Sequence, residues 1–112
     1  KQKTQQLRGL DFGCGIGTHA IIFNDFKIDA YGIDISEVAI SKAIENATKK
    51  GINCDRFLVQ PSDTHILPYV NDYFDFVLAI GPVYSLNLTD AIKCLKEINR
   101  VGKTSLIYKK NE

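Results

Sequence analysis

The apolar and polar positions of the chain follow two patterns in turn, and these predict strands and helices. Short, nearly continuous apolar runs are typical of strands in a covered parallel sheet, whereas apolar residues three and four positions apart predict helices. The predicted strands are 7–12, 29–34, 57–59, 74–80 and 104–108, and 60–71 is expected to be mostly loop. The predicted helices are 18–26, one between the N-cap Ser36 and a stop at Gly51, and one that Asn87 or Thr89 caps and Gly102 ends. This alternation predicts an α/β fold with a parallel sheet.

Composition bounds the size and the class of the protein. The 112 residues suffice for one domain, 1–112, and 45% hydrophobic with 24% charged residues is ordinary for a globular protein. The net charge of +1 argues against nucleic acid as a partner. No apolar run approaches the ~20 residues that span a bilayer, and the polar start does not resemble a signal peptide, so we expect a cytoplasmic protein without a membrane partner. Three cysteines without a C-x-x-C pair argue against a metal site and a disulfide framework.

One segment of the chain points directly to chemistry. Asp11-Phe12-Gly13-Cys14-Gly15-Ile16-Gly17 lies between a predicted strand and a predicted helix. Glycine lets the backbone approach a ligand closely, and the helix that follows directs N–H groups and a partial positive charge at the loop. The spacing is G-x-G-x-G, whereas the dinucleotide fingerprint G-x-G-x-x-G needs a glycine where this chain has Thr18. A turn needed only for packing is the alternative, and Cys14 is either a small residue that fills the loop or a reactive thiol.

Further polar groups are expected beside this loop, because ligands of such sheets bind beyond the carboxyl ends of the strands. Asp34 ends the second strand and can accept hydrogen bonds from ribose hydroxyls or cap the next helix, although Ser36 already suits the cap. Asp63 can accept a bond from an adenine amino group or form an ordinary turn. Asp11 can attract an ammonium group or be satisfied by nearby N–H groups of the loop.

The sequence reveals no catalytic residue. His19 and His65 can each act as a general base, but neither has an evident partner, and surface or packing roles are the preferred interpretation. Tyr84 and Ser85 follow the fourth predicted strand and are the candidates for substrate contact, with packing and turn formation as the alternative.

Five segments in order make the chain similar to the class I S-adenosylmethionine-dependent methyltransferases, in particular to the small-molecule type. The glycine loop and the second strand with its terminal acid resemble the first two motifs of that family. The segment 62–69 is similar to G-D-A-x-x-L-P-F with Ser62 in place of glycine, 74–77 to F-D-x-V, and 97–101 to E-x-x-R-V. The resemblance covers about 7–108, nearly the whole chain.

The resemblance implies a Rossmann-like, doubly wound, mostly parallel sheet of order 3-2-1-4-5 in three α/β/α layers. It implies the cofactor S-adenosyl-L-methionine, whose methyl group passes to an unidentified small-molecule acceptor and leaves S-adenosyl-L-homocysteine. The implied roles are the methionine part at Asp11, Gly13, Cys14, Gly15 and Gly17 with the main chain of Ala79 and Ile80, the ribose at Asp34, and the adenine at Ile35, Asp63 and Thr64.

Family members generally carry an N-terminal helical cap and two further strands after the fifth, which this chain lacks. We therefore expect a core domain truncated at both ends. Its last strand is expected to be an open edge, through which copies of the chain can self-associate. The alternatives to an enzyme are a non-catalytic module that binds S-adenosylmethionine or S-adenosylhomocysteine and a dinucleotide-binding domain, against which Thr18 argues.

Overall fold

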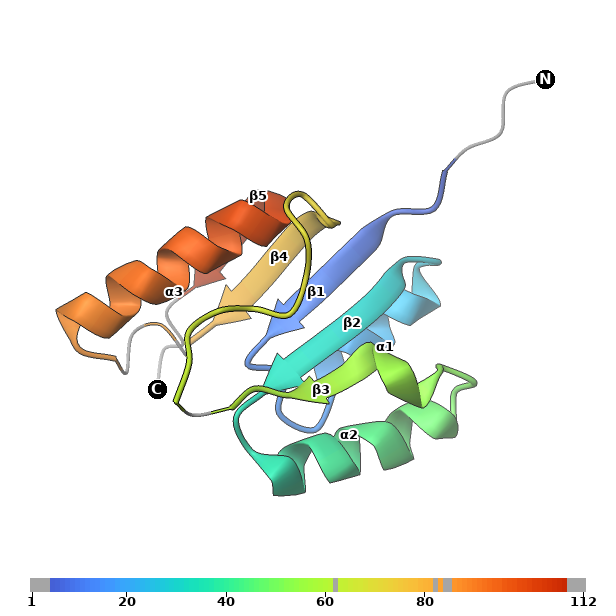
Figure 1. The fold of residues 1–112 in the computed structure, drawn as a ribbon. Coiled ribbons are helices and arrows are strands. Elements are labelled where there is room, and N and C mark those ends of the chain that lie inside the picture. Colours follow the sequence, from blue (N-terminus) through green and yellow to red (C-terminus); the bar gives the residue numbers. More distant parts are fainter. Residues whose placement is uncertain (1–4, 62, 82, 84–85, 109–112) are drawn as a thin grey trace.

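All five predicted strands are present and form one parallel sheet. The computed structural model describes residues 5–61, 63–81, 83 and 86–108. The strands are β1 (Arg8–Phe12), β2 (Asp29–Asp34), β3 (Phe57–Val59), β4 (Phe74–Ile80) and β5 (Gly102–Tyr108). Their order is β3-β2-β1-β4-β5, and each pair of neighbours runs parallel, as the family resemblance implied (Figure 1). The predicted α/β fold class is confirmed.

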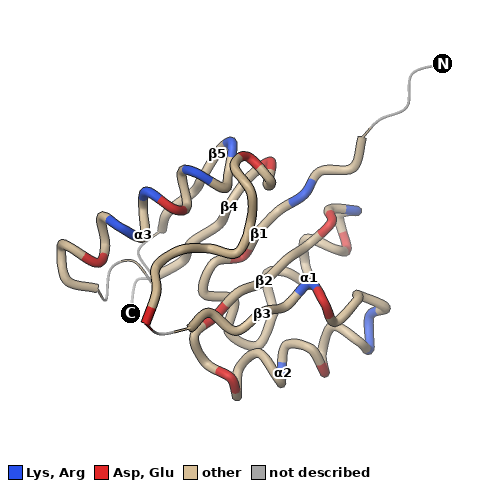
Figure 2. Tube along the Cα trace, in the orientation of Figure 1, with Lys and Arg blue, Asp and Glu red and all other residues tan. Residues whose placement is uncertain are grey.

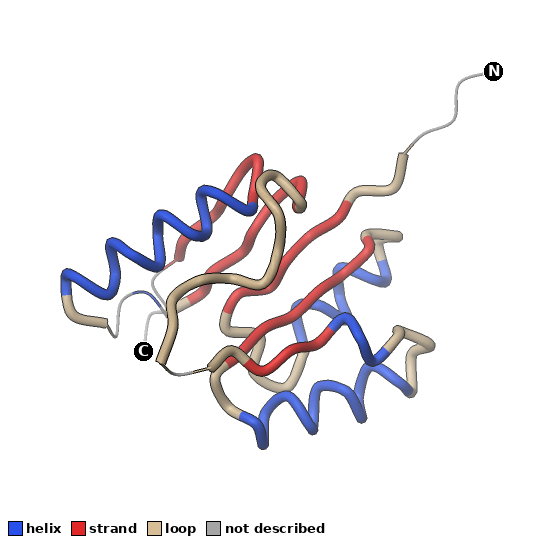
Figure 3. Tube along the Cα trace, viewed as in Figure 1, coloured by secondary structure: helices blue, strands red, loops and turns tan. Residues whose placement is uncertain are grey.

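Helices cover both faces of this sheet, which gives three layers. The helices are α1 (Thr18–Asp25), α2 (Glu37–Thr48) and α3 (Leu88–Val101), with a short 3-10 turn, η1 (Cys54–Arg56), that the sequence did not predict. One buried cluster joins Ala20 of α1 and Ala43 of α2 to Ala30 of β2. A second cluster joins Ile98 of α3 to Leu10 of β1. The segment between β3 and β4, drawn as a loop in Figure 3, packs into this second cluster through Leu67.

The boundaries of α2 follow the local signals of the sequence. Ser36 caps the helix, because its Oγ accepts a hydrogen bond from the N–H of Ala39 at 3.1 Å. Gly51 has a φ of 75°, the left-handed conformation in which glycine stops a helix. Both predictions are confirmed.

The junction of α3 and β5 differs from the prediction. Asn87 and not Thr89 caps α3, with Oδ1 accepting from the N–H of Asp90 at 2.9 Å. The last strand begins at Gly102, directly after the helix, instead of at Thr104. A Cβ at Gly102 would lie 2.6 Å from Cγ2 of Val77, so glycine permits the new strand to pass closely against β4.

Charged residues of both signs are interspersed along the trace (Figure 2). Within the described ranges, no helix is both long and apolar enough to cross a bilayer. The same ranges contain no group of three or more His, Cys, Asp or Glu side chains that could hold a metal ion. β5 lies at one edge of the sheet, where Leu106 is 60% exposed.

Candidate functional site

A pocket of about 550 Å³ opens at the carboxyl ends of the strands. Its walls come from the ends of β1, β2 and β4, from the segment after β3, and from the first turns of α3. Five of the residues expected at the cofactor line it, namely Gly13, Asp34, Ile35, Thr64 and Ile80. The site therefore lies where ligands of open parallel sheets bind.

The glycine loop forms a tight turn under one side of this pocket. The N–H groups of Gly13 and Cys14 both donate to the carbonyl of Ile33, at 2.8 and 3.0 Å, which ties the loop to β2. Gly15 has a φ of 56°, and a Cβ built on it would meet nothing within 4 Å. The space above Gly15 is thus open to a ligand. Gly17 precedes α1 with no side-chain cap, so the first N–H groups of that helix have no side-chain acceptor from the cap.

Asp34 links the glycine loop to the start of α2. Its Oδ2 accepts from the N–H of Gly15 at 2.8 Å, and its Oδ1 accepts from the N–H of Ser36 at 3.0 Å. Ser36, and not Asp34, caps the helix through its side chain. Each carboxylate oxygen can accept a further hydrogen bond, and Asp34 lines the pocket. Asp34 thus has both the position and the acceptor capacity for a ligand hydroxyl.

Asp11 lies at the end of β1, close to the first turn of α1. Only 2% of it is exposed, and its Oδ2 has no hydrogen-bond partner among the described residues. Nδ1 of His19 lies 3.8 Å from that oxygen. Burial, and secondarily the charge of Asp34, raises the pKa of the Asp11 carboxyl to about 7. The interpretation in which loop N–H groups satisfy this acid does not hold for Oδ2.

The side chain of Cys14 packs inward, away from the pocket. It is 6% exposed, and a Cβ added at Gly32 would lie 2.8 Å from its Sγ. Burial, followed by the charges of Asp11 and Asp34, raises the pKa of the thiol to about 12. The thiol therefore stays protonated near neutral pH, which favours the role of a small filler over that of a reactive thiol.

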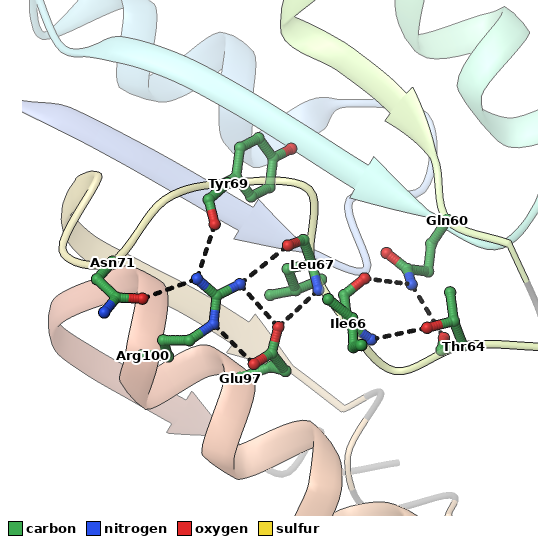
Figure 4. Close-up of polar contacts among 8 residues, drawn as sticks. All are labelled: Gln60, Thr64, Ile66, Leu67, Tyr69, Asn71, Glu97 and Arg100. Atoms are coloured by element: carbon green, nitrogen blue, oxygen red, sulfur yellow. Dashed lines mark hydrogen bonds and ion pairs between the residues drawn. The ribbon is translucent and has the colours of Figure 1, made fainter.

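The segment between β3 and β4 is held by a network of polar contacts (Figure 4). At its start, Nε2 of the buried Gln60 donates to the carbonyls of Thr64 and Ile66, at 3.0 and 3.2 Å. The hydroxyl of Thr64 accepts from the N–H of Ile66 at 3.1 Å. These bonds fix the backbone beside the pocket.

Glu97 and Arg100 of α3 hold the other end of that segment. Oε1 of Glu97 accepts from the N–H of Leu67 at 2.7 Å, and Arg100 donates to the carbonyls of Leu67 and Tyr69, at 3.0 and 2.8 Å (Figure 4). Arg100 also pairs with Glu97 through two bonds of 2.7 and 2.8 Å. The hydrogen bonds from Arg100 lower the pKa of the Glu97 carboxyl. The E-x-x-R spacing thus places an ion pair against the backbone of the loop that lines the pocket.

Replacing Arg100 by alanine is expected to lower the free energy of unfolding by about 2–3 kcal/mol, since Glu97 loses its cation and two loop carbonyls lose their donor. Urea denaturation measures this change. Lys96→Ala, at an exposed position of the same helix, is the control and should change stability by less than about 0.5 kcal/mol. Equal stability of the two variants would contradict the anchoring role.

The structure brings together only part of the predicted site. Asp63 is exposed and Ala79 is buried, and neither lines the pocket. Asp11, Cys14, Gly15 and Gly17 lie in or beneath the loop and not in the pocket wall. Tyr84 and Ser85, the candidates for substrate contact, lie outside the described residues.

The pocket also contains polar residues to which the sequence assigned no ligand role. His65 and Asp90 both line it, and Nε2 of His65 lies 3.3 Å from Oδ1 of Asp90. The preferred interpretation of His65 was a surface or packing residue without a partner. No local pattern joins the two residues, because they are brought together by the packing of α3 against the segment after β3.

Comparison with known proteins points to one family. The model of a methyltransferase domain family matches residues 3–108. The chain is 29% identical, over 86% of its length, to the uncharacterized methyltransferase YcgJ of Bacillus subtilis. It is 32% identical, over 89% of its length, to the sterol 4-C-methyltransferase strm-1 of Caenorhabditis elegans. It spans only 36% and 29% of the lengths of these two curated relatives.

A similar solved structure is also that of a methyltransferase. The SAM-dependent methyltransferase from Aquifex aeolicus superposes with a TM-score of 0.69 at 25% sequence identity. The match covers 86% of this chain and 50% of that chain.

Proposed function

Because the chain belongs to the class I S-adenosylmethionine-dependent methyltransferase family, we propose that its pocket binds S-adenosylmethionine and that the protein transfers the methyl group to a small-molecule acceptor. The observation that carries this proposal is the position of Asp34. Its carboxylate contacts the glycine loop through Gly15 and at the same time lines the pocket. A ribose bound at Asp34 has the loop on one side and the segment after β3 on the other.

The charge of the residues at the site complements that of the cofactor. Asp11 has a buried oxygen without a partner among the described residues, and a methionine ammonium near the loop would give this acid a counter-charge. The open space at Gly15 leaves room for close approach of the methionine part to the backbone. Together these features supply an acid and an accessible main chain at the place where the amino-acid part of the cofactor would lie.

The residues also fit the cofactor in shape. Ile35 lines the pocket, is 67% exposed and offers an apolar surface for one face of the adenine. Thr64 lines the pocket and would meet the adenine edge, and the main chain at Ile80, which also lines it, would lie near the methionine part. The bound cofactor supplies an activated methyl group, and the protein supplies binding and orientation.

Calorimetric titration with S-adenosylhomocysteine tests the proposal. We expect one site per chain, with an affinity at least about tenfold higher than that for NAD, which corresponds to about 1.4 kcal/mol. Preferential binding of NAD would support a dinucleotide-binding domain instead. Tight binding of S-adenosylhomocysteine without methyl transfer to any member of a broad acceptor panel would support a non-catalytic module.

A further inference from the structure

We propose that Gln60 is a positioning residue of the cofactor site. Its side chain holds 64–66 in the conformation that meets the adenine, and this sets the affinity for the cofactor more than it sets the stability of the fold. The inference rests on the proposed function, because it assigns an indirect role in binding the same cofactor. The sequence assigned Gln60 no ligand role.

Gln60 joins two walls of the pocket. It directly follows β3 and itself lines the pocket. Its backbone N–H donates to the carbonyl of Asp34 at 2.8 Å, which ties it to the proposed ribose wall. Its Nε2 donates to the carbonyls of Thr64 and Ile66, at 3.0 and 3.2 Å, which ties it to the proposed adenine wall (Figure 4). One residue therefore links the two walls.

The contacts of the Gln60 amide fix the orientation of the side chain. The amide nitrogen carries two N–H donors, and two carbonyls lie within hydrogen-bond distance of it. The opposite orientation would bring Oε1 against the same two carbonyls, where no hydrogen bond can form. Both carbonyls are thus directed at Gln60, and the conformation of 64–66 depends on this side chain.

Stability alone does not call for a glutamine at this position. Ile66 is 69% exposed, so the segment runs along the surface, and water could serve its carbonyls in other conformations. Oε1 of Gln60 is buried with no partner in the described ranges, which costs free energy that an apolar side chain of the same size would avoid. The glutamine instead selects one conformation beside the pocket, so a bound adenine does not have to order the segment itself.

Glu97 and Arg100 hold the same segment farther along the chain, and their contribution is different. Arg100 donates to the carbonyl of Leu67, beyond 64–66, and also pairs with Glu97. Removing one member of such an ion pair leaves a charge without its partner, which lowers stability. We therefore expect Arg100 to contribute mainly to the stability of the fold and Gln60 mainly to the affinity of the pocket.

Calorimetric titration of Gln60→Met with S-adenosylhomocysteine tests the inference. Methionine is unbranched, has nearly the length of glutamine and has no N–H donor. We expect the affinity to fall about tenfold, as for the loss of two ordinary hydrogen bonds. The midpoint of urea denaturation should stay close to the wild-type value, because the buried Oε1 is removed together with the donor. Arg100→Ala should show the opposite pattern, with a lower midpoint and an affinity within about threefold of the wild-type value.

Thr48→Val is the matched control. The hydroxyl of Thr48 donates to the carbonyl of Ile44 at 2.7 Å within α2, and Thr48 does not line the pocket. This variant also loses a side-chain donor to a backbone carbonyl, but at a distance from the pocket. Its affinity for S-adenosylhomocysteine should stay within about twofold of the wild-type value.

Amide hydrogen exchange locates the effect in the chain. Saturating S-adenosylhomocysteine should slow exchange in the glycine loop and at 64–66 of the wild-type chain. In Gln60→Met the ligand should still protect the glycine loop but should protect 64–66 much less. In the free variant the N–H of Ile66 should exchange faster, whereas that of Leu67, which donates to Glu97, should not change.

Three results would overturn the inference. The first is an affinity of Gln60→Met within about twofold of the wild-type value, and the second is equal protection of 64–66 in both chains. The third is a midpoint of urea denaturation as low as that of Arg100→Ala, which would assign Gln60 a general structural role. Failure of the wild-type chain to bind S-adenosylhomocysteine would instead overturn the proposed function, and the inference with it.

Discussion

Replacing Asp11 by asparagine is expected to raise the free energy of unfolding at pH 8 by about 2 kcal/mol. The carboxyl of Asp11 is buried, and its Oδ2 has no hydrogen-bond partner among the described residues. Moving its pKa from the ordinary value of 3.8 to about 7 corresponds to about 4 kcal/mol at high pH. The amide of asparagine is neutral but still buried, so we expect about half of that gain.

The direction of the pH dependence follows from the raised pKa. Between pH 3.8 and about 7 the folded state keeps the Asp11 proton, whereas the unfolded chain has released it. The stabilising contribution is therefore complete below pH 3.8 and is lost as the pH rises through about 7. In the wild-type chain the free energy of unfolding should fall over this range by more than in Asp11→Asn.

Urea denaturation at several pH values from 4 to 8 measures the effect. Asp75→Asn is a control that should change the free energy of unfolding in the opposite direction. The hydrogen bond from the N–H of Arg8 to the Asp75 carboxylate lowers the pKa of Asp75, so this carboxylate stabilises the fold. Asp75→Asn should lower the free energy of unfolding by nearly the same amount throughout this pH range, because the lowered pKa of Asp75 lies below it. A wild-type and an Asp11→Asn chain of equal stability at pH 8 would contradict the buried charge. The same Asp11 variant should bind S-adenosylhomocysteine more weakly, because an amide offers no charge to the ammonium group.

Replacing Asp34 by alanine is expected to lower the affinity for S-adenosylhomocysteine about 100-fold, or about 2.7 kcal/mol. Hydrogen bonds to a charged group contribute about 1.5–3 kcal/mol each, and the proposed ribose contact is lost. The N–H of Gly15 also loses its acceptor, so the glycine loop is held less firmly. Both changes lower the affinity for S-adenosylhomocysteine.

Calorimetry on two matched variants separates this effect from a general loss of structure. Asp29 lies on the same strand at its other end, where its Oδ1 pairs with Arg56 at 3.0 Å. Asp29→Ala should therefore leave the affinity for S-adenosylhomocysteine within about twofold of the wild-type value. Equal affinities of Asp34→Ala and Asp29→Ala would place the ribose elsewhere.

The parts of the fold that depend on local signals could be predicted from the sequence. The apolar run of β4 predicts a covered strand, and Ser36 and Gly51 mark the ends of α2 with a cap and a left-handed turn. The start of β5 at Gly102 could not be predicted in this way. A glycine after a helix indicates a break, whereas here Gly102 already pairs with Phe74 of β4 and passes close to Val77.

The candidate site likewise contains residues that could be placed from the sequence and contacts that could not. The glycine loop and Asp34 are adjacent to strand ends in the sequence, so their place at the rim follows from the parallel sheet. The contact between His65 and Asp90 depends on where α3 packs, and no pattern in the chain carries that information. Within the described part of the chain, Oδ2 of Asp11 has no hydrogen-bond partner, and this likewise depends on the surrounding backbone and not on its neighbours in sequence.

The central place of β1 determines the order in which a growing chain can complete its site. β1 pairs with β2 on one side and with β4 on the other, and β4 is synthesised only after β2, α2 and β3. The glycine loop and Asp34 can thus assemble while one edge of β1 is still without its neighbour. The wall formed by Ile80 and by the start of α3 arrives later. On the ribosome, the last wall of the pocket is therefore completed near the end of translation of this segment.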